Sequence, residues 1–336
     1  MKFLVIVFFT LVLISCRSDI QTGPLPEVKE VELEEIDPGL FTEEEWYMPY
    51  YLEHFSRVAN SVVDTGSIRV YFYLSVWRGA MNHHTYNARI MEVILSLVWF
   101  YTKDRPWNVY YRDRDLKLRI EAALDFWCSI QHEDGRFSEY RVAQWSLAPT
   151  AFATKFIGRA LWLLDHGPGI NKDVFERSRL ALRKALYIGF THEGLWEHGR
   201  NYTNQYANLW GGALLYLDVW PDEEIHNLLI SRFRQSMREF QSAIGYFYEK
   251  GGPDWGYNLS THHSDLQVAW EFAGGTEFEE LIVKKTREWY EWFSYNAVKE
   301  PHNQVFYLNR AIETRQQKGF YPGTVHEDPA HARWTP

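Results

Sequence analysis

The chain has 336 residues, of which 46% are hydrophobic and 24% charged, and its formal net charge is −9. This acidic balance argues against nonspecific binding of nucleic acid, which needs a basic surface. Two cysteines are too few for a multi-cysteine zinc site or a disulfide framework. Stability must therefore come from the large core that this length allows.

The N-terminus has the pattern of an export signal. Lys2 supplies a positive charge, and residues 3–14 form an apolar run that is too short to span a bilayer. The Leu-Ile-Ser-Cys sequence that follows resembles the bacterial lipobox, in which the cysteine, here Cys16, is lipidated and becomes the mature N-terminus. We therefore expect residues 1–16 to be a lipoprotein signal peptide and the protein to be exported and lipid-anchored to the cell envelope. An ordinary secretory signal is the alternative, and residues 17–44 are expected to form a flexible tether.

Helical periodicity dominates residues 45–300. Between Asn87 and Phe100, for example, apolar residues recur at i, i+3, i+4 and i+7. Short breaks with Gly or Pro separate similar runs, which lie near 115–131, 148–166, 173–190, 205–218, 222–243, 263–273 and 277–296. The pattern predicts an all-α domain of about nine to eleven helices, built from helical hairpins in a complete or incomplete ring. Residues 301–336 lack this pattern and are expected to form a partly extended tail or the start of a truncated domain.

Aromatic residues make up 17% of the chain. Most are expected to lie in the core. A sugar-binding cleft also uses such rings, because the axial C–H bonds of a sugar pack on a ring face while the polar ring edges bond outward.

Two polar clusters interrupt the helical pattern. Residues 251–263 place an aspartate, a tryptophan, a tyrosine and two adjacent histidines in a glycine-broken loop. Residues 199–208 gather an arginine and three asparagines at the mouth of another helix. We expect the two clusters to face one another across one cleft, because they occupy equivalent points of a helical-hairpin chain.

Three features resemble the α/α-toroid polysaccharide lyases of the chondroitin, alginate and heparinase II/III types. The Gln–x–x–Asp–Gly–x–Phe sequence at 131–137 is similar to the inter-helix turn of α/α-toroid enzymes. The asparagine-bearing helix mouth at 199–208 and the Asp–x–Gly–Tyr…His segment at 254–262 are similar to the lyase site. The resemblance covers roughly residues 45–320 and implies an α/α toroid that cleaves a uronate-containing glycan by β-elimination. We expect the β-sandwich domains that follow the toroid in these enzymes to be missing here.

The resemblance assigns three catalytic roles. Elimination needs a donor that neutralises the uronate carboxylate, a base that removes the C5 proton and an acid that protonates the leaving oxygen. The donor is an asparagine, with Asn204 preferred because it stands at a helix start, the base is His262 or His263, and the acid is Tyr257. Here the tyrosine precedes the histidine, whereas in chondroitin-type lyases the catalytic histidine comes first. Helix capping by the asparagines, a core position for Tyr257 and a structural role for one histidine are the alternatives.

Further side chains are expected to contact an acidic glycan because they are cationic, polar or aromatic groups in or beside these clusters or in other loops. They are Arg200, Asn201, Asn208, Trp210, Asp254, Trp255, His83 and Arg310. No cofactor and no metal is expected, since the His-Glu pair at 192–193 and the Glu-His pair at 197–198 do not form His–Glu–x–x–His. The lipid anchor is the only membrane contact expected.

Two other functions stay open. A glycoside hydrolase on the same toroid, of the unsaturated glucuronyl hydrolase type, would use carboxylates, for which Asp134, Glu249, Asp254 and Asp265 are the candidates. A surface lipoprotein that binds glycans without cleaving them would keep the aromatic cleft. A lyase creates a double bond that absorbs in the ultraviolet, this type of hydrolase consumes one, and a binding protein does neither.

The lipobox leads to a direct test. Cys16→Ser removes the only thiol that the signal offers for lipidation, so the variant should leave the membrane fraction or stall during processing. Fractionation followed by immunoblotting measures this, and an unchanged membrane fraction would count against lipidation at Cys16.

Overall fold

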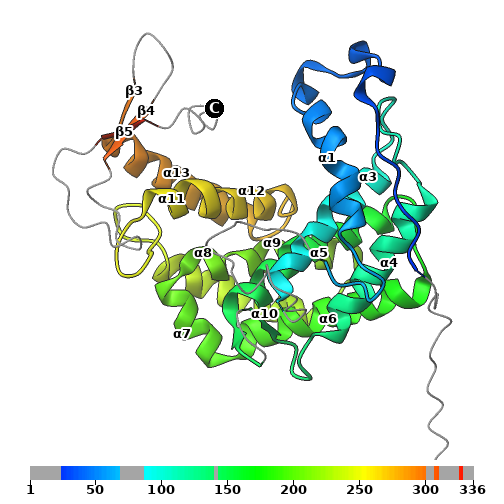
Figure 1. Cartoon of the computed structure of the whole chain (residues 1–336). Helices are drawn as coiled ribbons and strands as arrows, with labels where there is room; N and C mark the ends of the chain where they lie inside the picture. Colours follow the sequence, from blue (N-terminus) through cyan, green and yellow to red (C-terminus); the bar gives the residue numbers. More distant parts are fainter. Residues whose placement is uncertain (1–23, 69–86, 140–142, 300–305, 310–324, 328–336) are drawn as a thin grey trace, which may run out of the picture.

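The computed structural model describes residues 24–68, 87–139, 143–299, 306–309 and 325–327, and these are mostly helical (Figure 1). The all-α expectation is thereby confirmed. Within these ranges, no helix is long and apolar enough to cross a membrane. The expected signal with Cys16, and the expected glycan contacts His83 and Arg310, lie outside the described residues.

The helices and strands have these bounds. The α-helices are α1 (Met48–Asn60), α3 (Ile94–Thr102), α4 (Arg114–Ser129), α5 (Leu147–Asp165), α6 (Lys172–Thr191), α7 (Glu193–Asn201), α8 (Thr203–Tyr206), α9 (Asn208–Val219), α10 (Glu223–Glu239), α11 (Trp255–Tyr257), α12 (His263–Glu271) and α13 (Glu279–Asn296). The 3₁₀ turns are η1 (Leu33–Glu35), η2 (Pro38–Leu40), η3 (Glu43–Glu45) and η4 (Ala88–Val93), while η5 (Asn258–His262) is a π-helix. The strands are β1 (Phe137–Ser138), β2 (Trp145–Ser146), β3 (Ala297–Lys299), β4 (Phe306–Asn309) and β5 (Val325–Glu327).

The long helices pack in two rows. In the first row α3, α5, α9 and α12 each contact the next, and in the second row α6 lies between α4 and α10. Successive helices alternate between the rows, because α3 packs on α4, α5 on α6, α9 on α10, and α12 on α13. Helical hairpins therefore repeat along the chain, as the periodicity predicted (Figure 1).

The two rows differ in composition. In α5 most of the 19 residues are buried, and α9 is buried throughout Asn208–Tyr216. Close contact between them depends on small residues, since a side chain at Gly212 would overlap Thr154. The second-row helices bury one stripe each, and α4, α6 and α10 begin with the capping side chains of Asp113, Asn171 and Asp222. The first row is thus the interior of the protein.

One turn occurs twice with the same sequence pattern, Gln–x–x–x–Gly–x–Phe–x–Glu. It spans 131–139 after α4 and 241–249 after α10. In both copies the glutamine amide donates to the glycine carbonyl and to a carbonyl of a neighbouring helix, α6 in the first copy and α13 in the second. The phenylalanine is fully buried in both copies. This turn sends the chain from the second row back to the first.

The glycine of this turn cannot be replaced without strain. Gly135 has φ 105° and Gly245 has φ 109°, in the region that glycine tolerates best. A Cβ atom would also overlap the carbonyl of Lys184 on α6 or of Glu288 on α13. Gly66, with φ 82°, approaches α4 in the same way after α1. After α1, α4 and α10, a glycine thus lies directly against the backbone of a neighbouring helix.

Residues 24–44 differ from the flexible tether expected for 17–44. Val28 is buried, and its backbone N–H donates to Asn60 at the end of α1. The guanidinium of Arg119 on α4 donates to the carbonyl of Pro26 at 2.6 and 2.9 Å. Burial of Val28 and pairing of a buried arginine hold this segment against the helices, which the Glu- and Pro-rich composition did not reveal.

The C-terminal strands form a small antiparallel sheet in the order β3–β4–β5. β3 follows α13 directly, and β4 lies within the region where the sequence predicted extended structure. This sheet is packed at the end of α13 in Figure 1.

Candidate functional site

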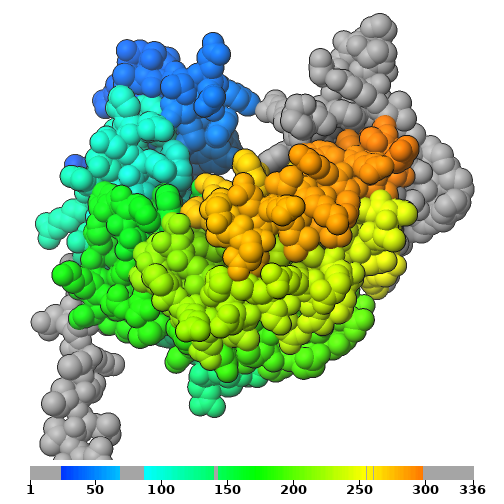
Figure 2. All heavy atoms as spheres, turned by 180° about the vertical axis from the view of Figure 1, so that it is seen from behind, coloured from blue at the N-terminus to red at the C-terminus, as the bar shows by residue number. Residues whose placement is uncertain are grey.

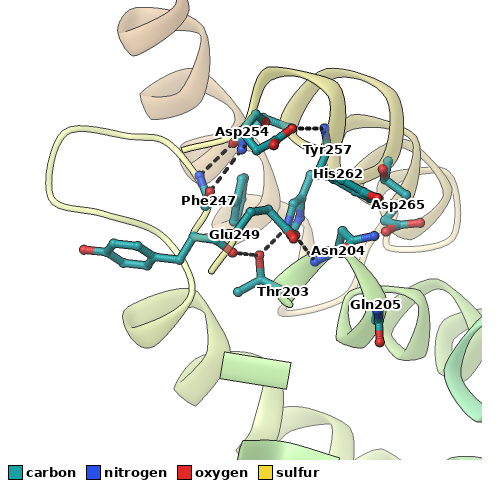
Figure 3. A network of polar contacts seen from close by, with 12 residues as sticks. Thr203, Asn204, Gln205, Phe247, Glu249, Asp254, Tyr257, His262 and Asp265 are labelled. Carbon is teal, nitrogen blue, oxygen red and sulfur yellow. Dashed lines mark hydrogen bonds and ion pairs between the residues drawn. The ribbon is translucent and has the colours of Figure 1, made fainter. Parts of the chain in front are cut away.

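The two polar clusters lie in direct contact (Figure 3). The hydroxyl of Thr203 on α8 is hydrogen-bonded to His262 Nε2 at the end of η5. The backbone N–H of Asn204 donates to Glu249 Oε1 at 2.8 Å, and the Asn208 amide lies 3.4 Å from Asp265 Oδ2. The structure thus brings residues 199–208 and 247–265 into one polar site. The two segments touch directly, whereas the sequence predicted that they face one another across a cleft.

The clusters are helical, which corrects the expectation of loops. Gly199 to Asn201 form the last turn of α7, and α8 follows after Tyr202. Residues 251–254 are irregular, but the chain is helical from Trp255 through α11, η5 and α12. The glycines that predicted a loop are confined to the entry of this helix. A π-helix inside an α-helix is often found at functional sites.

His262 is the central residue of the site. Its side chain is fully buried, and its ring stacks on Phe247 with centroids 4.3 Å apart and planes 12° apart. Thr203 Oγ1 donates its single hydrogen to the carbonyl of Tyr248 at 2.7 Å, so it must accept a hydrogen from His262 Nε2. The imidazole therefore carries its proton on Nε2, and its buried Nδ1 has no hydrogen-bond partner among the described residues.

Glu249 joins the three segments of the site. Its carboxylate accepts from Asn204 and lies 3.6 Å from His262 Nε2, and its side chain is fully buried. It is the last residue of the second copy of the repeated turn. Its backbone also pairs with Tyr202 and Gly252 through isolated bridges. The repeated turn thus delivers a carboxylate into the interior of the first row.

A buried ion pair adjoins the histidine. Lys155 on α5 donates to Asp265 on α12, and Asp265 is fully buried. Burial raises the pKa of Asp265, and the positive charge of Lys155 opposes this rise. Asn208 on α9 donates to the carbonyl of Asn204 and faces Asp265, while its Oδ1 has no partner within the described part of the chain. Because all nearby partners are acceptors, this amide orientation is fixed.

Asp254 and Asn258 hold the entry of the helix. Asp254 is fully buried and accepts from the backbone N–H of Tyr257 at 3.2 Å. The side-chain amide of Asn258 exchanges two hydrogen bonds with the backbone of Phe247 and also accepts from the indole of Trp289. Asp254, predicted to contact the glycan, is therefore an interior residue whose carboxylate orders this turn.

The other two predicted catalytic groups are more accessible. Tyr257 is half-buried, at the end of α11. His263 is also half-buried, and its ring packs edge-on against Trp289 and Tyr290 of α13, with centroids 4.9 and 5.1 Å away. The two adjacent histidines therefore point to different neighbours, as expected for consecutive helical residues.

Three of the predicted glycan contacts occupy different environments. Arg200 and Asn201 are exposed at the end of α7, and Arg200 lies 3.4 Å from both Glu197 and Glu239. Trp210 was predicted to contact the glycan, but it is fully buried and packs on Phe233 and Phe240. The prediction for Trp210 is wrong, because α9 is a central helix on which every side is covered. For Trp255 the backbone alone lies within the described structure.

A second buried charge cluster lies about one turn of α5 away from Lys155. Arg89 of η4 pairs with Glu92 and with Glu139, and its guanidinium lies 3.9 Å from the centroid of the Phe152 ring. Burial raises the pKa of Glu92, against the opposing charge of Arg89. Glu139 is the last residue of the first copy of the repeated turn, in the same position as Glu249. The two copies thus place equivalent glutamates in two interior clusters.

The described residues form no metal site, and a pocket lies apart from His262. Among the described residues, no group of three or more His, Cys, Asp or Glu side chains is arranged to hold a metal ion. His192, part of one loose ligand pair, caps α7 by accepting from the Leu195 N–H. A pocket of about 470 Å³ lies between residues 29–36 and 109–115, which do not contribute to the His262 site.

No family model, curated protein or solved structure matches this chain. The sequence analysis also did not identify several residues of the site. Thr203, Lys155 and Phe247 lie on patterns that read as ordinary helix and turn. The repeat of Gln–x–x–x–Gly–x–Phe–x–Glu is the signal that could have located Glu249 and Phe247.

The Thr203 hydroxyl allows a test of the site's polar contacts. Thr203→Val keeps the shape but leaves His262 Nε2–H and the Tyr248 carbonyl without their partner, so the free energy of unfolding should fall by about 1–3 kcal/mol. Thr203→Ser retains the hydroxyl and serves as the control, with a loss below about 1 kcal/mol. Urea unfolding measures both, and equal losses in the two variants would show that the hydroxyl contributes nothing.

Proposed function

We propose that the protein is a carbohydrate-active enzyme, a polysaccharide lyase that cleaves a uronate-containing glycan by β-elimination. The observation that carries the proposal is the convergence of the asparagine cluster and the Tyr–His segment through Thr203, Glu249 and His262. Amide, imidazole and phenol groups are the types that elimination next to a carboxylate uses. As an exported lipoprotein, the enzyme would act at the cell envelope.

We also propose that the two rows are an incomplete α/α toroid. Alternation of successive helices between an inner and an outer row supports this architecture. Three glycine contacts support it further, because Gly66, Gly135 and Gly245 each place the chain against a neighbouring helix, which is α4, α6 and α13 respectively. A regular step of this kind is what generates a curved array of hairpins.

The burial of the site residues favours particular roles. Full burial of His262, and its contacts with Thr203 and Glu249, suit a group that orients its neighbours rather than one that contacts the glycan. Tyr257 and His263 are half-buried. In this proposal His263 removes the C5 proton, and the phenol of Tyr257 protonates the leaving oxygen. Asn204 is buried like His262, with its backbone held by Glu249, so it also suits a group that orients the site. The exposed Asn201 of the same cluster is then the amide that neutralises the uronate.

The carboxylates favour a lyase over the hydrolase alternative. Glu249, Asp254 and Asp265 are fully buried, and each is engaged with protein groups. Asp134 lies in the first copy of the turn, where hydrogen bonds from Arg136 and His132 outweigh its desolvation and keep its pKa low. The general acid of a hydrolase needs a raised pKa and access to the glycosidic oxygen. Asp134 does not have a raised pKa, and the three buried carboxylates do not have access to a glycan.

Tyr257→Phe separates a catalytic tyrosine from a core tyrosine. The ring and its packing remain, so folding should be intact, while the loss of a proton-transfer group should reduce turnover by about a hundredfold or more. Turnover is followed by the ultraviolet absorbance of the double bond on hyaluronan, chondroitin, alginate and polygalacturonate. Tyr246→Phe, a half-buried tyrosine on the repeated turn, is the matched control and should retain full turnover.

The outcomes distinguish the three functions. Loss of absorbance from an unsaturated oligosaccharide would establish the hydrolase, and glycan binding without any product would establish the binding protein. Turnover that is unchanged by Tyr257→Phe would overturn the role given to this tyrosine.

A further inference from the structure

Helix α1 has two stripes of different character. The buried stripe repeats at helical spacing and consists of Met48, Leu52, Phe55 and Ala59. The two residues before α1 and its first turn expose large rings, with relative exposures of 65% for Trp46, 46% for Tyr47, 62% for Tyr50 and 53% for Tyr51. We call these four residues the aromatic patch.

The rings of the aromatic patch form one continuous surface. Tyr47 lies edge-on to Trp46 at 5.7 Å and to Tyr51 at 6.0 Å between ring centroids, and Tyr50 lies 5.7 Å from Tyr51. The patch contains no aliphatic side chain. Contiguous exposed apolar surface of this kind marks a binding site more often than a random surface feature.

The support under the patch is rigid. Thr42 and Glu45 form a capping box just before Trp46. Glu45 also accepts hydrogen bonds from Arg105 Nε at 2.9 Å and from Trp107 Nε1 at 3.1 Å, and Phe41 stacks on Trp107. These contacts tie the start of α1 to the loop after α3, so the rings are presented without the ordering cost of a mobile segment.

The position of the patch argues against a lipid surface as its ligand. The backbone N–H groups of Leu25 and Val28 donate to Asp64 and Asn60, so the described chain begins beside the C-terminal end of α1. The patch is at the other end of this helix, about 18 Å away. A lipid-anchored N-terminus therefore enters the protein far from the patch. Figures 1 and 2 show α1 near the α3 end of the first row and α13 at its α12 end.

The charge around the patch selects among glycans. Glu43, Glu44 and Glu53 are exposed next to the rings, so an anionic group would be repelled there. Tyrosine and tryptophan provide flat apolar faces with polar edges, which match the faces and hydroxyls of an uncharged pyranose. We propose that the aromatic patch binds the uncharged sugars of the glycan chain, so that the substrate is a mixed polymer that contains both uronate and uncharged sugars. This inference rests on the proposed lyase function.

Affinity electrophoresis of the full chain tests the binding. In gels containing hyaluronan, whose uronate alternates with an uncharged N-acetylhexosamine, Trp46→Ala and Tyr50→Ala should each weaken retardation about tenfold, the loss of one ring–sugar contact. Tyr187→Ala is the matched control, because Tyr187 is a 39% exposed ring on the second-row helix α6 and is not part of the patch, and this variant should be retarded like the parent chain. Circular dichroism checks that each variant is folded.

Two further measurements separate the possible failures. Cleavage of hyaluronan should exceed that of polygalacturonate at least tenfold, and equal rates would overturn the mixed-polymer inference while leaving the lyase proposal intact. Absence of product on every polymer would overturn the lyase proposal. Retardation in hyaluronan gels would then still test whether the aromatic patch binds a glycan. Retardation that is unchanged by both patch variants, or loss of binding to phosphatidylglycerol vesicles in them, would show that the patch does not serve a glycan.

Discussion

The rest of the structure depends on the burial of Lys155 and Asp265 between α5 and α12. Neither charge can be left unpaired in a core without a cost of several kcal/mol, so each fixes the position of the other. Asp265 also faces Asn208, which in turn holds the carbonyl of Asn204. Three first-row helices and the helix mouth at α8 are therefore held in one arrangement. Hydrophobic packing alone would allow α12 to slide along α9 at small cost, whereas the directional polar contacts do not.

The repeated turn extends the same constraint along the chain. Its glutamine ties the end of one second-row helix to a neighbouring helix, and its glutamate enters the interior. In the first copy Glu139 meets Arg89, and in the second Glu249 meets Asn204 and His262. One local pattern thus gives both the regular step of the helices and the carboxylates of two buried clusters. In the proposed lyase, the second cluster positions the proton-transfer and neutralising groups, while the aromatic patch holds the glycan farther along.

The sequence predicted much of this fold because amphipathic periodicity reports burial directly. The helices near 115–131, 148–166 and 173–190 are found within a few residues of those bounds. Burial of a polar residue leaves no such period, so the interior positions of Asp254 and His262 could not be read from their neighbours. The error at Trp210 has the same origin, because the sequence around a tryptophan near a polar cluster is the same whether its ring contacts a ligand or lies in the core. Packing of residues 24–44 was missed because it depends on Arg119, which is distant in sequence.

A double-mutant cycle on Lys155→Met and Asp265→Leu, read as free energies of unfolding in urea, tests the central claim most directly. Each single change leaves one buried charge without its partner and should cost about 3 kcal/mol or more. The double variant should cost clearly less than the sum of the two, with a coupling energy of about 2 kcal/mol between the sites. Additive losses would contradict the claim that this pair sets the arrangement of α5, α9 and α12 around the site.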